Sequence, residues 1–112
     1  MEMQVSDIDQ VTKVALSGRL DSAGASQIEM RFTAVIVPKG QPAIVDLSEV
    51  SFLASLGVRL IISTARALLG KGRKLALYGA NPTVMEIIET TALHEIVLVA
   101  GSEGEAIGMV KA

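Results

Sequence analysis

The run from Ala43 to Leu47 constrains the fold most strongly, because all of its side chains except that of Asp46 are aliphatic. A strand that is apolar on both faces must be covered on both faces, which is typical of a parallel sheet flanked by helices. A helix with an apolar face is predicted a few residues later. The predicted inward positions of that helix are Val58, Ile61, Ile62, Ala65, Leu68 and Leu69. This pair of segments predicts an α/β architecture.

The remaining segments alternate in the same way. Further strands are predicted over residues 3–8, 11–16, 74–78 and 96–99, and the first two form a hairpin. Three more helices are predicted. The first is capped by Asp21 or Ser22 and ends at residues 38–40, the third starts at Asn81-Pro82, and the last covers residues 102–111 with a Ser102/Glu105 capping box. The apolar positions assigned to the first and third helices are Ile28, Phe32, Val35, Ile36, Val84, Ile87 and Ile88.

This order, β-β-α-β-α-β-α-β-α, predicts an α/β sandwich. Its centre is a mostly parallel sheet of about five strands with an N-terminal hairpin, and it carries four helices. The length of 112 residues suits one domain, 1–112. The core must be aliphatic, because half of the residues are hydrophobic and only 3% are aromatic.

Charge and composition narrow the class of protein. The net charge of -2 and the lack of a basic stripe argue against direct nucleic-acid binding. No apolar run is long enough for membrane insertion, and no signal peptide is recognisable. The chain has no cysteine and one histidine, so thiolate chemistry and most histidine metal sites are excluded. We expect a cytoplasmic protein with neither metal nor cofactor.

No motif indicates an enzyme. Residues 70–72, Gly-Lys-Gly, follow a helix where a dinucleotide loop would follow a strand, so a helix stop is the simpler interpretation. His94 lies in a connection, where a solvated or capping role is the more common one. The acidic side chains near the C-terminus have surface spacings and are predicted to be solvated: Glu86, Glu89, Glu103 and Glu105.

Three polar side chains are predicted near one rim of the sheet. Asp21 follows the second strand, Asp46 lies near the end of the third, and Ser55 begins the helix after it. The carboxyl ends of parallel strands form the usual binding edge. Each residue also has a structural interpretation: Asp21 as the cap of the first helix, Asp46 as the start of a turn through Ser48, and Ser55 as the N-cap of the second helix.

With these residues in place, the whole chain resembles a STAS domain, the fold of anti-sigma factor antagonists. The resemblance rests on four segments in order: residues 16–21 (LSGRLD), residues 44–52 (IVDLSEVSF) with 54–57 (ASLG), residues 74–82 (KLALYGANP), and residues 91–93 (TAL). It implies the STAS fold over 1–112 and a regulatory binding module that is not an enzyme.

The resemblance also implies partner switching. In this family the unphosphorylated protein binds an anti-sigma factor that is also a serine kinase. The kinase, using its own ATP and magnesium, phosphorylates the serine that begins the second helix, which is Ser55 here, and the complex then dissociates. A serine phosphatase removes the phosphate and restores the binding form. A phosphate adds about -1.5 to -2 charges, and the positive end of the helix dipole tolerates them.

Two neighbours of the phosphoacceptor depart from the family pattern. Ala54 stands where Asp is common, and Leu56 where Ser or Thr is common. Both changes make the loop more apolar and leave the acceptor hydroxyl in place. Arg59, one helical turn after Ser55, stands where many members have a small residue. It is placed to pair with a phosphate on Ser55 or with an acidic group of a partner, or it is simply solvated.

These considerations predict a phosphorylation site at Ser55 and a partner surface with Leu56 as its apolar anchor. The residues of that surface are Asp21, Ser22, Asp46, Ser55, Leu56, Gly57 and Arg59. The alternative is an unmodified STAS scaffold subunit of a transport or signalling complex, which the apolar loop favours. Direct nucleotide binding is a third class, but the chain has no phosphate loop. We expect a monomer or a weak dimer.

Overall fold

The computed structural model describes residues 1–112 and has the predicted order of elements, with one additional short 3-10 helix. The strands are β1 (Glu2–Ile8), β2 (Val11–Leu20), β3 (Ala43–Leu53), β4 (Leu75–Tyr78) and β5 (Leu98–Ala100). The helices are α1 (Ser22–Ile36), α2 (Ser55–Leu69), α3 (Pro82–Thr90), the 3-10 helix η1 (Leu93–Glu95) and α4 (Glu103–Lys111).

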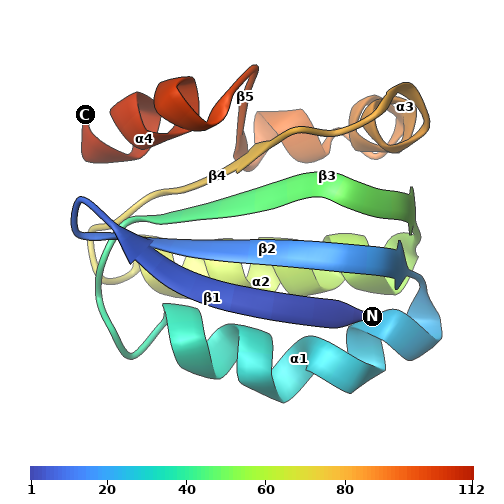
Figure 1. The fold of residues 1–112 in the computed structure, drawn as a ribbon, viewed down its shortest axis with the longest axis horizontal. Coiled ribbons are helices and arrows are strands. Elements are labelled where there is room, and N and C mark those ends of the chain that lie inside the picture. The colour runs from blue at the N-terminus through green and yellow to red at the C-terminus, as the bar shows by residue number, and fades with distance from the viewer.

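The five strands form one mixed sheet in the order β1-β2-β3-β4-β5 (Figure 1). β1 and β2 pair in antiparallel fashion, and all later pairs are parallel. The hairpin turn has Asp9 and Gln10 at φ angles of 54° and 65°. Two left-handed residues make a turn whose twist matches that of the strands, which explains a tight hairpin without glycine.

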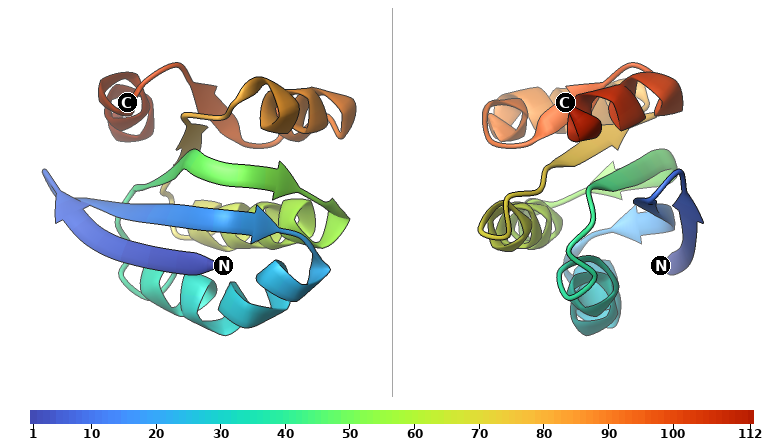
Figure 2. Two further views of the ribbon diagram at one scale, coloured as in Figure 1. Left: turned by 45° about the vertical axis from the view of Figure 1, so that its right-hand side comes forward. Right: turned by 90° about the vertical axis from the view of Figure 1, so that its left-hand side faces the viewer.

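The helices cover the two faces of the sheet unequally. α1, α2 and α3 lie on one face and α4 lies on the other (Figure 2). Side chains of α1, α2 and α3, such as Phe32 and Ile61, share the larger apolar cluster with Val45. α4 buries Ala106 and Val110 in the smaller cluster. Each of α1, α2 and α3 connects two neighbouring parallel strands. Because these connections are right-handed and each new strand is added at the same edge of the sheet, the three helices lie on one face.

Three predicted helix caps are confirmed. Asp21 Oδ1 accepts the N–H of Gly24 at 2.9 Å, and Asn81 Oδ1 accepts the N–H of Val84 at 2.8 Å. Ser102 Oγ accepts the N–H of Glu105 at 3.2 Å. The cap predicted for α2 is wrong. Ala54 is its N-cap, at φ -113° and ψ 174°, and provides no side-chain hydrogen bond, so Ser55 is the first helical residue.

The buried face of α2 is partly rotated from the predicted one. Leu69, predicted to be buried, is 63% exposed, whereas Leu60 and Thr64 are buried. The cause is α1, which packs alongside α2. Thr33 Oγ1 and Thr64 Oγ1 lie 3.5 Å apart across the two helices. A helix that contacts both a sheet and a neighbouring helix buries a wider stripe than a helix that contacts a sheet alone.

Two strands are longer than the sequence predicts, and one is shifted. β2 continues to Leu20 and β3 to Leu53, with register shifts after Ala15 and Gly18. These bulges let β3 continue through the polar residues Ser48 and Glu49, which look like a turn in the sequence. β5 starts at Leu98 instead of residue 96, because η1 and the residues after it occupy the preceding segment.

Candidate functional site

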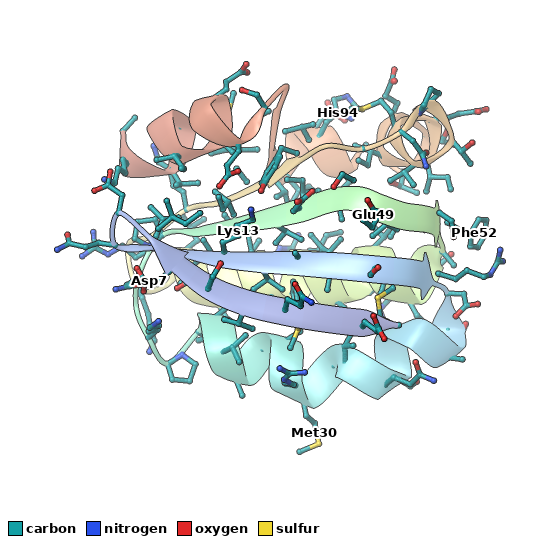
Figure 3. The ribbon with its side chains drawn as sticks, viewed as in Figure 1. Asp7, Lys13, Met30, Glu49, Phe52 and His94 are labelled. Atoms are coloured by element: carbon teal, nitrogen blue, oxygen red, sulfur yellow. The ribbon has the colours of Figure 1, made fainter.

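The carboxyl ends of β2 and β3 meet at the rim where α1 and α2 begin. The N–H of Ala54, the residue directly after β3, donates to the carbonyl oxygen of Leu20 at 2.9 Å, so the ends of the two strands are held together by a hydrogen bond. Asp21 and Ser55 each follow directly, and both helix N-termini therefore lie at this rim. Phe52 marks this end of β3, opposite the end of the sheet at which Asp7 lies (Figure 3).

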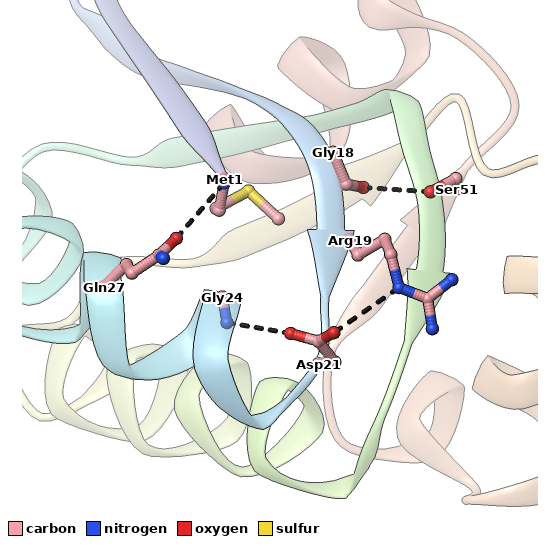
Figure 4. Close-up of polar contacts among 7 residues, drawn as sticks. All are labelled: Met1, Gly18, Arg19, Asp21, Gly24, Gln27 and Ser51. Carbon is pink, nitrogen blue, oxygen red and sulfur yellow. Dashed lines mark hydrogen bonds and ion pairs between the residues drawn. The ribbon is translucent and has the colours of Figure 1, made fainter.

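Asp21 is held at the rim by two contacts (Figure 4). One carboxylate oxygen caps α1 at the N–H of Gly24, and the other lies 3.4 Å from Nε of Arg19. The hydrogen bond from Gly24, followed by the Arg19 charge, holds the pKa of the Asp21 carboxyl below its usual range. Asp21 is therefore ionised at neutral pH. It also caps the first helix, which is the structural role predicted for it from the sequence.

Arg19 and Phe52 are rim residues that the sequence did not single out. The Arg19 guanidinium lies over the Phe52 ring, 4.6 Å from its centroid. Such a cation–π contact, together with the ion pair to Asp21, orders a long side chain that is otherwise exposed. Beside them, Ser51 Oγ lies 3.4 Å from the carbonyl oxygen of Gly18 (Figure 4). No local spacing signals these cross-strand pairs, because they depend on the bulged register of β2 and β3.

Two glycines allow the helices to approach the strands closely. A Cβ atom at Gly24 would lie 2.1 Å from the carbonyl oxygen of Arg19. A Cβ at Gly57 would lie 2.7 Å from Leu20 Cγ and 2.8 Å from the carbonyl oxygen of Leu20. Gly57, predicted as a partner contact, is buried and acts on the rim by fixing the position of the first turn of α2.

Ser55 is exposed at the start of α2. The first hydrogen bond of the helix runs from the N–H of Val58 to the carbonyl oxygen of Ala54 at 3.0 Å, so the three preceding N–H groups have no partner within the helix. The first turn contains no acidic residue. The positive end of the α2 dipole therefore points towards solvent beside the Ser55 hydroxyl.

A groove of about 400 Å³ runs between α1 and α2 next to Ser55. Leu56, which is 41% exposed, lies on its wall together with Arg59. Glu29 contributes a carboxylate from α1, but no ion pair joins it to Arg59. The other lining residues are Ala25, Ser26, Leu60 and Ser63. The predicted exposure of Leu56 and Arg59 agrees with the structure, whereas the contribution of α1 to the groove was missed.

Asp46 is not at this rim, and its predicted position there is wrong. β3 continues for seven residues beyond it, to Leu53, which at about 3.3 Å per residue places it roughly 20 Å away. Its Oδ1 accepts the N–H of Ser48 at 2.9 Å, so the local turn contact foreseen for it exists within a bulge.

The surroundings of Asp46 are polar and partly buried. It pairs in register with Tyr78 on β4. Burial, followed by the Asp46 charge, raises the pKa of the Tyr78 hydroxyl, which has no hydrogen-bond partner. Lys13 projects towards α4 (Figure 3), with its Nζ 3.4 Å from Glu103 Oε1. Glu103, predicted to be solvated, is therefore half-buried and ion-paired, because it lies in the first turn of α4 within reach of Lys13 on β2.

The other polar features of the sequence have structural roles. Gly70 caps α2, and Gly72 has a φ of 77°, as a turn that stops a helix requires. His94 is exposed, and its Nδ1 lies 3.4 Å from the carbonyl oxygen of Ile88. No three His, Asp or Glu side chains are grouped closely enough to hold a metal ion. None of the helices has the length and hydrophobicity needed to span a bilayer.

Comparison with known proteins assigns the chain to a family. The STAS domain model matches residues 2–106. The anti-sigma-B factor antagonist of Listeria monocytogenes is 25% identical over 108 residues, covering 96% of this chain and 94% of that protein. The crystal structure of an anti-sigma factor antagonist from Mycobacterium paratuberculosis has a TM-score of 0.88 at 25% identity, over 99% of this chain and 94% of its own.

The fold is shared more widely. The phosphorylated form of the Bacillus cell fate determinant SpoIIAA has a TM-score of 0.69 at 24% identity, over 97% of this chain and 99% of its own. Two of the segments that carried the resemblance in the sequence, residues 16–21 and residues 44–57, contain the strand ends and the first turn of α2 that build the rim. The chain belongs to the STAS domain family, and over nearly its whole length it is similar to the anti-sigma factor antagonists of that family.

Proposed function

We propose that this STAS domain is a partner-switching module whose switch is phosphorylation of Ser55. The unphosphorylated protein binds an anti-sigma factor with serine kinase activity and thereby releases a sigma factor. Phosphorylation by that kinase ends the complex, and a serine phosphatase restores the binding form. The protein acts by binding and carries out no reaction itself.

The observation that carries the proposal is the setting of the Ser55 hydroxyl. It is exposed at the first position of α2, makes no capping hydrogen bond and lies beside three N–H groups without helical partners. A kinase can reach it without unfolding any part of the domain. The positive end of the helix dipole then stabilises the added phosphate by about 0.3–1 kcal/mol in an exposed setting, so modification leaves the fold intact.

The charge balance at the rim explains how a phosphate would release a partner. The charged side chains around the groove and the strand ends are two cations, Arg19 and Arg59, and two carboxylates, Asp21 and Glu29. A phosphate of about -1.5 to -2 charges would turn this balanced surface negative. A partner surface fitted to the balanced state would then face an unmatched charge, which costs several kcal/mol when like charges meet.

Arg59 is positioned to interact with the modified serine. It lies one helical turn after Ser55, and helical side chains point back towards the N-terminus of their helix, so its guanidinium can approach a phosphate on Ser55. No ion pair occupies it in the unmodified protein. Phosphorylation would thus draw Arg59 away from the groove and remove a contact available to the partner.

The apolar loop around the acceptor favours one other function. Ala54 and Leu56 suit permanent packing, so an unmodified scaffold subunit of a transport or signalling complex is the second candidate. The two candidates differ in one respect that can be measured, the appearance of phosphate on Ser55.

The test is intact-mass analysis after incubation with ATP, magnesium and each serine kinase encoded near the gene of this protein. We expect one phosphate on the unmodified chain and none on Ser55→Ala. Ser22→Ala is the matched control, because Ser22 is also exposed at the first position of a helix at the same rim. Loss of phosphate in Ser22→Ala with retention in Ser55→Ala would move the switch to α1, and a complete absence of phosphate would leave the scaffold as the function.

A further inference from the structure

Basic residues gather at the end of α2 that is far from Ser55. Between residues 50 and 85 the chain contains no Asp or Glu, and its Arg and Lys residues there are Arg59, Arg66, Lys71, Arg73 and Lys74. All but Arg59 lie in the last turn of α2 or in the segment that leads into β4. In a chain with a net charge of -2, this is a local surplus of positive charge.

Exposed aliphatic side chains lie in the same place. Leu69 is 63% exposed, Ile96 47% and Leu98 37%. They line a groove of about 300 Å³ between the C-terminal half of α2 and the segment that enters β5. We call this the basic groove. Its further lining residues are Ala65, Arg66, Arg73, Lys74, Leu75 and Val97.

The cations of the basic groove form no ion pair with an acidic side chain. The four ion pairs of the structure use Lys13, Arg19, Lys39 and Lys111. Within the groove, Arg73 Nε donates to the carbonyl oxygen of Gly40 at 3.1 Å, which orients this cation without neutralising it. Lys74 Nζ donates to a backbone oxygen of Ala112, the last residue of the sequence, at 3.0 Å. Arg66, which lines the groove, and Lys71, which follows α2 and is not a lining residue, make no side-chain hydrogen bond or ion pair.

The basic groove is separate from the Ser55 rim. α2 runs along the sheet from one end to the other (Figure 1). Its 15 residues rise by about 1.5 Å each, so roughly 21 Å separates its first and last residues. That distance exceeds the Debye length of about 8 Å at physiological ionic strength, so charges at one end act only weakly on the other.

We propose that the basic groove is a second docking surface, for an acidic segment of another protein that inserts aliphatic side chains between Leu69 and Leu98. Uncompensated cations around an apolar floor are complementary to a segment that presents carboxylates beside a leucine or isoleucine. The groove is concave, so a protruding side chain can insert into it, whereas a flat bilayer surface would not fill it. The domain thereby holds two partners at once, one at each end of α2.

The test is an amide-shift titration of the isotope-labelled protein. The probe is a synthetic amphipathic peptide with leucine on one face and glutamate on the other, and the comparison is the same peptide with lysine in place of glutamate. We expect the glutamate peptide alone to bind, with the largest shifts at Leu69, Ile96 and Leu98 and none at Leu56. Binding should weaken as salt concentration rises.

Charge-reversal variants distinguish specific binding at the basic groove from non-specific electrostatic attraction of the acidic peptide. The double variant Arg66→Glu/Lys71→Glu should lose at least tenfold in affinity, and Arg31→Glu, an exposed unpaired cation on α1, should lose less than twofold. Equal losses in both variants, equal binding of the lysine peptide, or shifts at the Ser55 rim would overturn the proposal. So would binding to phosphatidylglycerol vesicles without binding to the peptide, which would assign the groove to membrane lipid. Because Arg66 and Lys71 make no side-chain hydrogen bond or ion pair, the double variant should remain folded at the temperature of the titration, with a lowered melting temperature because carboxylates at the C-terminal end of α2 oppose the helix dipole.

Discussion

Gly57→Ala tests how tightly the first turn of α2 is held against the sheet. The new methyl carbon would lie 2.7 Å from Leu20 Cγ, 2.8 Å from the carbonyl oxygen of Leu20 and 3.0 Å from Leu53 Cδ1. The leucine side chains can turn slightly, but the carbonyl oxygen belongs to the hydrogen bond that joins β2 to Ala54. The helix must therefore move, and the Ser55 hydroxyl moves with it.

The expected magnitude is the difference between two effects. Overpacking a tight contact costs about 1–3 kcal/mol, while replacing glycine by alanine in a helix gains up to about 1 kcal/mol. Because the clash includes a backbone carbonyl oxygen, the cost lies in the upper part of its range, about 2–3 kcal/mol, and the net loss of unfolding free energy is about 1–2 kcal/mol. For a domain of this size that corresponds to a fall in Tm of roughly 4–8 °C. Urea unfolding followed by far-ultraviolet circular dichroism measures the free energy directly.

Gly108→Ala is the matched control. Gly108 also lies inside a helix, but nothing lies within 4 Å of the position of its Cβ. That variant should be stabilised by up to about 1 kcal/mol, because only the propensity gain applies. A Gly57→Ala protein as stable as the unmodified chain, or a Gly108→Ala protein that is less stable, would refute the close-approach argument.

Three further predictions concern single side chains. Leu56→Asp should abolish binding of the proposed anti-sigma partner while changing the unfolding free energy by no more than about 0.5 kcal/mol. Unfolding of that variant would instead place Leu56 in the core. Asn81→Ala should cost about 1 kcal/mol in urea unfolding, because it removes the cap to Val84 and the 3.2 Å hydrogen bond to the carbonyl oxygen of Val50; an unchanged stability would contradict this. The single tyrosine, Tyr78, should ionise with a midpoint above the usual value of about 10, since burial raises its pKa. The stability gained by burying the neutral Tyr78 hydroxyl is therefore fully present below about pH 10, and it is lost as the pH rises through the raised pKa. A spectrophotometric titration of Tyr78 with a midpoint at or below about 10 would contradict a buried hydroxyl.

Local patterns predicted most of the fold. The caps at Asp21, Asn81 and Ser102 are each decided by a side chain and an N–H group three residues apart, so the sequence around them contains the necessary information. The same holds for the buried strand at Ala43 and for the alternation of strands and helices. The local sequence pattern also identified Ser55 and Leu56 as exposed residues at the start of a helix.

The predictions that were wrong concern residues whose positions depend on contacts between segments far apart in the sequence. Asp46 was expected at the rim because Ser48 and Glu49 look like a turn, but pairing with β2 and two bulges carry β3 on to Leu53. Leu60 is buried and Leu69 is exposed because of how α2 meets α1 and the segment before β5, which helical periodicity alone does not contain. The Arg19–Phe52 contact likewise exists only once β2 and β3 are in register.

The central claim is that a phosphate on Ser55 weakens binding to the anti-sigma partner. The most direct measurement is calorimetric titration of that partner with the unmodified protein and with protein carrying phosphoserine at position 55. We predict an increase in Kd of at least tenfold, which corresponds to about 1.4 kcal/mol, with an unchanged far-ultraviolet spectrum. Equal affinity of the two forms for the partner would contradict the proposed switch.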